Sequence, residues 1–392
     1  MKAKERRLNE LKNRIAEVTP EQAQRLLGNG AVLIDVREDD EVAQGSPPGA
    51  LRISKGYLEL RIEDAVPDTG RPLLVMCAAG ARSLFAAEAL LQMGYQDVRS
   101  VAGGFNRWKN EGLPFEMPRL LDEQRKKRYS RHLLLPEVGA EGQLKLLDSK
   151  VLLVGAGGLG SPAALYLAAA GVGTLGLVDH DVVDRSNLQR QVLHTDERVG
   201  VSKVASARDT LTALNPDVNI MGFETHLNRD NVDEILSQFD LVLDGSDNLP
   251  TRYLLNDACV KLGLPNVHGA VYRFEGQLTV FWPGHSQHEG GCYRCMFPQP
   301  PPPAAAPSCS EIGVLGVLPG VIGLLQAVEV IKLLLGIGTP LIGKILYFDA
   351  LAARFSEFKA PRRAQCPVCG DHVQAIEYQD YEQICATPGG GS

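Results

Sequence analysis

The sequence predicts two α/β domains in series, the second built around a mostly parallel sheet with helices on its faces. From residue 151 onward, short apolar runs of strand length alternate with helical patterns, as is typical of parallel sheets. A glycine-rich turn, GAGGLG, joins the apolar run that begins at Val151 to an Ala/Leu-rich segment that ends at Ala170. The first third shows a smaller strand-then-helix pattern, and 392 residues are enough for two or three domains.

Changes in composition divide the chain into four segments. We expect a first domain over residues 17–118, a linker with a leading helix over 119–150, the main domain over 151–378, and a disordered tail over 379–392. The linker is polar and charged, and its EQRKKRYSRHLLL run predicts a helix over Glu123–Leu135.

Composition and charge exclude several functional classes. The chain has 40 basic and 47 acidic residues, a net charge of −7, which argues against a nucleic-acid partner. The N-terminal stretch contains no continuous apolar run of the kind found in export signals. The most apolar region, Ile312–Leu335, is interrupted by polar residues and predicts a buried helix rather than a membrane span. The eight cysteines therefore belong in a reducing cytoplasm, where metal binding or catalysis is favoured over disulfides.

The first domain places a cysteine where a reactive thiol is expected. The run PLLVMC predicts a strand that ends at Cys77, and AAGARS then leads into a helix over Leu84–Leu91. Curled backbone N–H groups, a helix N-terminus and the guanidinium of Arg82 would all favour the thiolate of Cys77 over its thiol. A buried core thiol is the alternative.

Four motifs make this region resemble the rhodanese domain. They are IDVRE, PPGALRI, CAAGARS and GGFNRWKNEGLP, in the expected order. The resemblance implies that Cys77 carries a persulfide, which the loop amides and Arg82 stabilise. The loop between these two residues is one residue shorter than in the related phosphatases, which suits sulfur better than phosphate. An inactive module used only for docking remains an alternative.

The glycine turn of the second domain is suited to hold a phosphate. Glycines let backbone N–H groups approach an anion closely, and a helix N-terminus adds partial positive charge. The next strand, Thr174–Val178, ends at Asp179, where an acidic residue would bind a ribose hydroxyl. Alone, these features indicate an NAD-dependent dehydrogenase. The glycines of the turn are Gly155, Gly157, Gly158 and Gly160.

Charged residues further along favour ATP with magnesium over a nicotinamide cofactor. SNLQRQ supplies Asn187 and Arg190, and Lys203 opens the next helix. LVLDGSDN places Asp244 and Asp247 at the carboxyl end of a strand, where one carboxylate can hold a metal that carries triphosphate oxygens. Hydride transfer needs no such cluster of charged side chains, so the sequence predicts a binding site for a nucleoside triphosphate.

Two CxxC turns predict a structural zinc site. Four thiolates complete a closed tetrahedral site and leave no position for a substrate, although catalytic zinc is the alternative. Because the two pairs lie far apart in the sequence, the bound zinc would tie a long crossover segment to the C-terminal end of the chain. The four ligands are Cys292, Cys295, Cys366 and Cys369.

The segment from Asp122 to about Glu377 resembles the MoeB/ThiF family of ubiquitin-activating-like adenylyltransferases. The motifs RYSRHLLL, GAGGLGSPAALYLAAAGVGTLGLVD, SNLQRQVLH, GVSKV, DLVLDGSDN, GQLTVF, CYRC and CPVC occur in the family's order. The resemblance implies a Rossmann-like adenylating domain that acts as a homodimer. It also assigns roles: Asp179 to the ribose, Asn187, Arg190 and Lys203 to the triphosphate, Asp247 to magnesium, and Arg131 to the site of the other subunit.

The resemblance further implies a substrate, a small ubiquitin-like sulfur-carrier protein of the MoaD/ThiS type that ends in Gly-Gly. The expected reaction is adenylation of its C-terminal carboxylate, followed by attack of a Cys77 persulfide and formation of a thiocarboxylate. A separate donor such as a cysteine desulfurase would load the persulfide. Cys309, which follows a proline-rich segment, is the candidate for a second thiol that forms a thioester or resolves the intermediate, or else is an unreactive loop thiol.

Alternatives to this mechanism stay open. The enzyme could only adenylate, with the rhodanese module idle, or the chain could be a non-catalytic scaffold. MoeB-like motifs favour molybdopterin cofactor biosynthesis, whereas thiamine, tRNA thiolation and secondary metabolites are other destinations for the carrier's sulfur.

Overall fold

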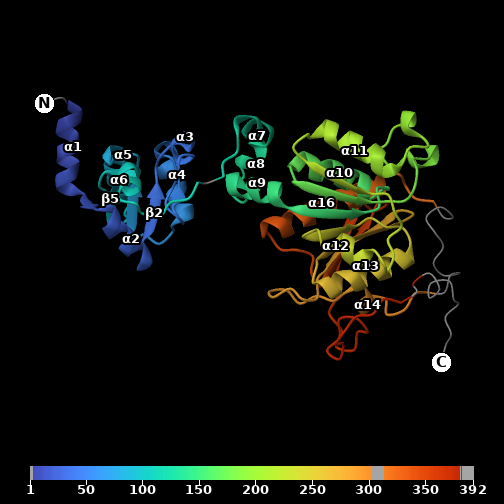
Figure 1. Ribbon diagram of the computed structural model, residues 1–392. Coiled ribbons are helices and arrows are strands. Elements are labelled where there is room, and N and C mark those ends of the chain that lie inside the picture. The colour runs from blue at the N-terminus through green and yellow to red at the C-terminus, as the bar shows by residue number, and fades with distance from the viewer. Residues whose placement is uncertain (1–2, 118, 302–312, 380, 382–392) are drawn as a thin grey trace. The chain divides into compact units, whose positions relative to one another are not determined.

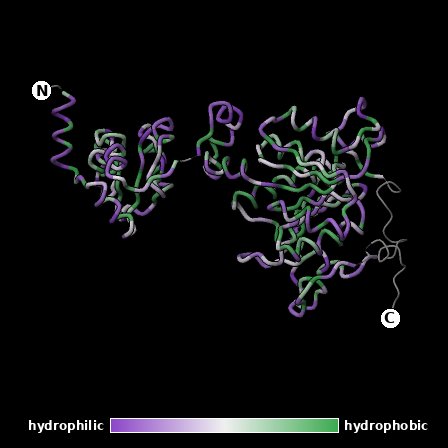
Figure 2. The backbone as a smooth tube through the Cα atoms, viewed as in Figure 1, coloured by the Kyte–Doolittle hydropathy of each residue, from purple (hydrophilic) through white to green (hydrophobic). Residues whose placement is uncertain are grey.

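The computed structural model describes residues 3–117, 119–301, 313–379 and 381. It divides into two compact units, Met1–Asp122 and Glu123–Ser392. Figure 1 shows the elements of each unit, and Figure 2 shows that hydrophobic residues gather in the strands at the centre of each one.

The first unit is a five-stranded parallel sheet with helices on both faces. The strand order is β1-β5-β4-β2-β3. The strands are β1 Ala16–Val18, β2 Val32–Asp35, β3 Leu51–Arg52, β4 Leu73–Met76 and β5 Val98–Val101. The helices are α1 Ala3–Arg14, α2 Pro20–Gly28, α3 Asp39–Val42, the 3-10 turn η1 Lys55–Tyr57, α4 Leu58–Ala65, α5 Ala81–Gln92 and α6 Gly104–Asn110.

Alternating side chains of these strands enter two separate cores. Ile34 and Val75 pack into the core that α1, α4 and α5 cover, whereas Leu33 and Leu74 pack into the core that α2 and α6 cover. Because a parallel sheet of this kind is buried on both faces, its central strand β4 is apolar throughout and β2 is apolar up to Asp35. The carboxyl ends of β2 and β4 therefore come together at one edge, where the Cys77 loop lies.

The second unit contains an eight-stranded mixed sheet in the order β13-β12-β11-β10-β9-β6-β7-β8. Strands β10, β9, β6, β7 and β8 are parallel, and β11, β12 and β13 continue the sheet antiparallel. The strands are β6 Lys150–Val154, β7 Thr174–Val178, β8 Asn219–Phe223, β9 Leu241–Asp244, β10 Asn266–Tyr272, β11 Glu275–Phe281, β12 Lys344–Asp349 and β13 Arg354–Lys359.

Helices cover both faces of the parallel part. One face packs against α10, α11 and α16, and the other against α12 and α13. The helices and 3-10 turns of this unit are α7 Glu123–Arg128, α8 Ser130–Leu133, α9 Gly139–Asp148, α10 Gly160–Ala170, η2 Arg185–Asn187, η3 Asp196–Arg198, α11 Lys203–Leu214, α12 Val232–Leu236, α13 Leu249–Leu262, α14 Tyr293–Met296 and α16 Val317–Leu335. This α/β architecture matches the fold class expected from the sequence.

Helix α16 is, among the described residues, the one helix long and apolar enough to cross a membrane. It packs against α10, β10 and β11, and Ala327 and Val330 lie in the core with the central strands. Part of its apolar surface is therefore buried by packing, as predicted for Ile312–Leu335, of which residue 312 lies outside the described residues.

The prediction of one continuous helix over Glu123–Leu135 is wrong, because the structure has two helices there, α7 and α8, which are separated at Tyr129. The Tyr129 side chain is buried, and its hydroxyl accepts a hydrogen bond of 2.9 Å from Nδ2 of Asn215. Tertiary contacts therefore interrupt a segment whose local propensity favours continuous helix. At the other end of the unit, Tyr381 is buried and donates to Asp257 at 2.8 Å, although the sequence suggested a disordered tail from residue 379.

Candidate functional site

Cys77 lies in a tight loop between β4 and α5 of the first unit. Its Sγ accepts a hydrogen bond of 3.1 Å from the backbone N–H of Gly80 and lies 3.5 Å from Oγ of Ser83. The side chain is 1% exposed. The thiol therefore sits inside a curl of backbone at the start of a helix, the environment that the sequence predicts for a persulfide carrier.

The start of α6 holds the Cys77 loop in place through two backbone hydrogen bonds. The N–H of Phe105 donates to the carbonyl of Cys77 at 2.8 Å, and the N–H of Asn106 donates to that of Ala78 at 3.0 Å. Gly104 has a φ of +59°, and a Cβ there would lie 2.1 Å from the Cys77 carbonyl oxygen. Only glycine fits this close approach, which explains the GGF sequence at this point.

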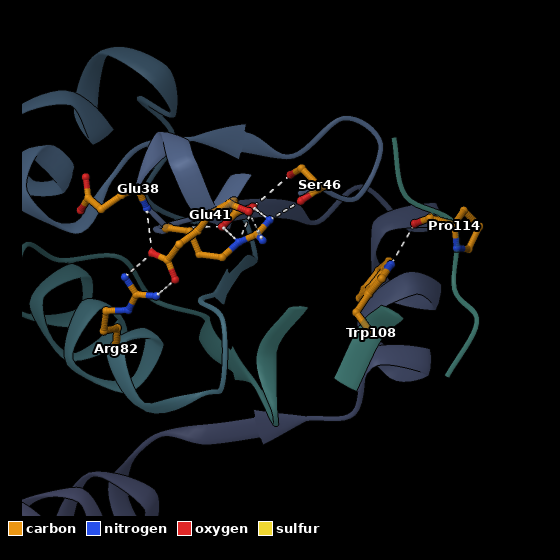
Figure 3. A network of polar contacts seen from close by, with 9 residues as sticks. Glu38, Glu41, Ser46, Arg82, Trp108 and Pro114 are labelled. Atoms are coloured by element: carbon orange, nitrogen blue, oxygen red, sulfur yellow. Dashed lines mark hydrogen bonds and ion pairs between the residues drawn. The ribbon is translucent and has the colours of Figure 1, made fainter. Parts of the chain in front are cut away.

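Arg82, which was expected to stabilise the sulfur, is paired with Glu41 of α3 (Figure 3). Its two terminal nitrogens lie 2.7 and 2.5 Å from the two carboxylate oxygens. This bidentate hydrogen bond holds the pKa of Glu41 below its usual value and raises that of Arg82. Cys77 also acts electrostatically on Arg82, but less strongly than Glu41 does.

A buried ion pair fixes the segment that carries Glu41. The guanidinium of Arg37 donates to both oxygens of Asp35 at 2.6–3.2 Å and to the carbonyl of Glu41 at 3.1 Å. The hydroxyl of Ser46 donates to the same aspartate at 3.0 Å. Buried charges are costly unless they are paired, so movement of α3 would have to break these contacts. The network therefore holds α3 in place beside the Cys77 loop.

In the second unit, a cleft opens at the carboxyl ends of β6, β7 and β9. The glycine turn after β6 forms its floor, and the N-terminus of α10 points toward it. A Cβ on Gly160 would lie 1.9 Å from the Gly155 carbonyl oxygen, so the turn can close only with glycine there. A helix N-terminus next to free backbone N–H groups is a binding site for phosphate.

Asp179 follows β7 and orients the middle of the glycine turn. Its Oδ2 accepts a hydrogen bond of 2.8 Å from the N–H of Ala156. The buried His194 contacts the carbonyl of the same residue, with Nε2 3.0 Å from the Ala156 carbonyl oxygen and Nδ1 2.9 Å from Oγ of Ser206. Burial lowers the pKa of His194, which keeps the ring neutral. Since a carbonyl only accepts, Nε2 carries the proton.

Two basic side chains, Arg190 and Lys203, line the cleft beside this turn, together with acidic ones. Lys203 is buried at the start of α11 and lies 2.7 Å from Asp181, whereas Arg190 donates to the carbonyl of Ser186 at 3.2 Å. Asp247 is exposed in the loop after β9 and also lines the cleft. The residues of this cleft that the sequence analysis named are Gly155, Gly157, Gly158, Asp179, Arg190, Lys203 and Asp247.

Asp244, the other carboxylate of the LVLDGSDN motif, has a structural position. It is buried, with Oδ2 2.7 Å from Nδ1 of His268 and Oδ1 accepting from the hydroxyl of Ser246 at 2.6 Å. Burial alone would raise the pKa of Asp244, but His268, Arg252 and Ser246 together outweigh it, and the pKa lies below its usual value. Asp247 is therefore the carboxylate of this motif that is available to a metal in the cleft.

Other residues named from the sequence do not line the cleft. Asn187 lies in η2, where its Nδ2 is 3.5 Å from Oγ of Ser186. Gly160 starts α10 behind the turn, and Arg131 is exposed on α8. Cys309 lies outside the described residues.

The four cysteines of the two CxxC turns form one cluster. Their Sγ atoms all lie within 4.8 Å of one another, with 3.5 Å between Cys292 and Cys366 and 3.4 Å between Cys295 and Cys369. Zinc–sulfur bonds of about 2.3 Å place tetrahedral thiolates roughly 3.8 Å apart, so the cluster fits zinc. The N–H of Arg363 donates to Sγ of Cys295 at 3.3 Å, which offsets part of the thiolate charge.

Several residues that shape the two sites are not recognisable from the sequence. Glu41 falls in the acidic run after the IDVRE motif and gives no sign of its partner before the fold is known. Asp181 and His194 lie within or beside quoted motifs, but their partners come from other elements. Gln191 also lines the cleft. Only the positions of these residues in motifs could have drawn attention to them.

Comparisons with known proteins find relatives of both units. The model of the ThiF family matches residues 129–368, and that of the rhodanese-like domain matches residues 19–111. The SAMP-activating enzyme E1 of Haloferax volcanii is 51% identical over 267 residues, which cover 68% of this chain and 97% of that protein. The sulfur carrier protein adenylyltransferase of Thermus thermophilus is 53% identical over 259 residues, 66% of this chain and 96% of that protein.

A third relative combines two activities in its name. The adenylyltransferase and sulfurtransferase MOCS3 of Drosophila grimshawi is 52% identical over 259 residues, 66% of this chain and 57% of that protein. Among solved structures, E. coli MccB with ATP is similar with a TM-score of 0.54 and 23% identity, over 64% of this chain and 76% of that one. That likeness shows the fold. The family match covers more than half of the sequence, and the chain therefore belongs to the ThiF family and carries a rhodanese-like domain ahead of its ThiF domain.

Proposed function

We propose that this chain uses ATP to adenylate the C-terminal carboxylate of a small ubiquitin-like sulfur-carrier protein and then transfers sulfur to it from a Cys77 persulfide. One observation carries the proposal: a single chain contains both a glycine-turn cleft with cations and an acid around it and an enclosed loop thiol. The relatives named as adenylyltransferases of sulfur carriers and as adenylyltransferase and sulfurtransferase support it.

The first step is adenylation of the carrier. A carboxylate oxygen of the carrier attacks the α-phosphorus of ATP, and pyrophosphate leaves with the electron pair of the broken P–O bond. Arg190 and Lys203 would offset the negative charge that builds on the phosphates, while Asp179 would hold the ribose. Asp247 would hold magnesium, which supplies further charge compensation when bound.

The second step is sulfur transfer. The terminal sulfur of the Cys77 persulfide attacks the activated carbonyl, AMP leaves, and an acyl disulfide forms. A second thiolate, for which Cys309 is the candidate, then attacks Sγ of Cys77, releases the carrier thiocarboxylate and leaves a disulfide for a cellular dithiol to reduce. Covalent linkage of the two units raises the effective concentration of the persulfide near the adenylate.

Several finer assignments belong to the same proposal. Arg131 is exposed on its own subunit, which is consistent with action on the cleft of a second copy in a homodimer. Zinc bound by the four clustered cysteines would be structural. A cysteine desulfurase is the expected persulfide source, and a reducing cytoplasm suits the free thiols. Molybdopterin cofactor biosynthesis is the favoured destination of the sulfur.

Mass spectrometry of candidate carriers tests the proposal. After incubation with ATP, magnesium, cysteine and a cysteine desulfurase, we expect the carrier to gain the mass of one oxygen-to-sulfur exchange. Carrier-dependent exchange of pyrophosphate into ATP should occur even without the sulfur donor. A chain that binds carriers but shows no such exchange would be a scaffold, and exchange without thiocarboxylate would indicate an enzyme that only adenylates.

A further inference from the structure

The mouth of the Cys77 loop has unusual electrostatics for a site that accepts sulfur. Arg82 is the one cation in the CAAGARS segment, and both of its terminal nitrogens are bound to the Glu41 carboxylate. Glu41 ends an uninterrupted acidic run, EDDE, over residues 38–41. Glu38 also acts electrostatically on Arg82. The positive charge that could attract an anion to Cys77 is thus already neutralised.

The ion pair is built into the fold. The Glu41 carboxylate accepts a further hydrogen bond of 3.2 Å from the N–H of Glu38, and the Glu41 carbonyl accepts one from the buried Arg37. Figure 3 shows Glu41 between Glu38 and Arg82, with contacts to both. The side chains of Glu41 and Arg82 are 29% and 40% exposed, so an incoming donor would meet the pair. A carboxylate fixed from two sides cannot swing away to free the guanidinium without breaking these contacts.

Sulfur donors differ in the charge that they bring to such a site. Thiosulfate is a small dianion, and its sulfite leaving group is also a dianion. An organic persulfide, R–S–S⁻, brings one charge, and its leaving thiolate carries one. The attraction that an unpaired Arg82 would exert doubles with the charge of the donor, so its pairing with Glu41 weakens the binding of a dianion more than that of a monoanion.

We propose that Glu41 selects the sulfur donor of Cys77: by holding Arg82 in an ion pair, it disfavours dianionic thiosulfate and leaves the loop to organic persulfides. In the favoured reaction the Cys77 thiolate attacks the terminal sulfur of R–S–S⁻. The donor S–S bond breaks, its electron pair leaves on the donor thiolate, and Cys77–S–S⁻ forms. No external oxidant or reductant is needed. The inference rests on the proposed role of Cys77 as a persulfide carrier.

The test measures thiosulfate:cyanide sulfurtransferase activity of the full chain. In this reaction Cys77 takes the outer sulfur of thiosulfate, sulfite leaves, and cyanide then removes the sulfur as thiocyanate. Glu41→Gln keeps the shape and an acceptor for Arg82 but removes the charge, and we expect kcat/KM for thiosulfate to rise about tenfold or more. Asp40→Asn is the matched control, because it removes the same charge from an exposed position of the same helix. We expect less than about a twofold change for it, the size of a screened surface effect.

Loading with organic persulfide separates this inference from the proposed function. Wild type and Glu41→Gln should both acquire a Cys77 persulfide from a cysteine desulfurase with cysteine, or from the persulfide of 2-mercaptoethanol, whose only charge is that of the persulfide. The relative rates of the two arms show whether a protein or a small thiol is the better donor. If neither loads the wild type, the proposed role of Cys77 fails. Suppose instead that both donors load the wild type. The selection by Glu41 is then wrong, while the proposed function stands, if Glu41→Gln does not raise kcat/KM for thiosulfate or if Asp40→Asn raises it equally.

A measurement on the wild type covers the case in which Glu41→Gln does not fold. Added KCl screens attraction between charges, so the wild-type rate at low thiosulfate should not fall as the ionic strength rises, because Glu41 already neutralises Arg82. A fall with ionic strength would mean that the mouth of the loop attracts dianions and would overturn the inference.

Discussion

The Cys77 loop and the glycine turn have the same local design but different chemistry. Each joins a parallel strand, β4 or β6, to a helix, α5 or α10, and each turns backbone N–H groups toward the space at the helix N-terminus. In the first loop the turn encloses a thiol, and its arginine is tied to a carboxylate. In the second the turn carries no nucleophile. Its Lys203 is paired with Asp181, but Arg190 donates to a backbone carbonyl, so the charge of Arg190 remains available to phosphates. Neighbouring elements, rather than the turn itself, therefore decide which charges surround the helix N-terminus.

Removal of the thiol is expected to have the largest effect. Cys77→Ala should reduce thiocarboxylate formation to background and leave carrier-dependent ATP–pyrophosphate exchange at the wild-type rate, since the two sites use different residues. Mass spectrometry of the carrier and an exchange assay measure the two activities. Cys259→Ala, which removes a buried thiol of α13, is the control and should keep both. Equal thiocarboxylate yield from Cys77→Ala would contradict the role of the first site.

Loss of a zinc ligand should affect the second unit alone. Cys366→Ser should lower the zinc content and destabilise the unit by several kcal/mol, because metal binding free energy contributes to folding. Thermal unfolding followed by calorimetry, with and without a chelator, and elemental analysis of the purified protein check this. A variant with unchanged zinc content and an unchanged unfolding temperature would show that the cluster is no zinc site.

Removal of a positive charge beside the glycine turn is expected to slow adenylation. Lys203→Ala should lower the rate of ATP–pyrophosphate exchange about 100-fold, which corresponds to roughly 2.7 kcal/mol of transition-state stabilisation. Loading of Cys77 from an organic persulfide should not change. Lys127→Ala, which removes an exposed lysine of α7, should leave the exchange rate unaltered. Equal losses in both variants would mean that net charge rather than the position of Lys203 matters.

The ion pair beside Cys77 should give the smallest effect, and one that depends on pH. The folded pKa of Glu41 lies below its usual value of 4.5 because of the Arg82 hydrogen bond. The pair therefore stabilises the first unit at pH values above 4.5, and this stabilisation is lost as the pH falls through the lowered pKa. At neutral pH, urea unfolding should show Glu41→Gln less stable than wild type by at most about 1 kcal/mol, since the pair is partly exposed. A difference that grows in acid would contradict the assignment.

The sequence predicted the fold and much of the cleft because these depend on local patterns. Apolar runs marked the parallel strands, and the glycine turn and Asp179 followed directly from their places at strand ends. Side-chain pairing could not be predicted in the same way, since Glu41 reaches Arg82, and His194 reaches Ala156, across elements that the fold alone brings together. The break at Tyr129 was missed for the same reason, because its partner Asn215 lies far along the chain.

The central claim is that sulfur held on Cys77 is delivered to a carrier that the ATP cleft has activated. A single-turnover experiment tests it most directly: Cys77 is loaded with radiolabelled persulfide, free donor is removed, and carrier is added with or without ATP and magnesium. We predict that label appears in the carrier thiocarboxylate only with ATP, and that Lys203→Ala blocks the transfer. Label that remains on Cys77 while the carrier becomes adenylated would contradict the account.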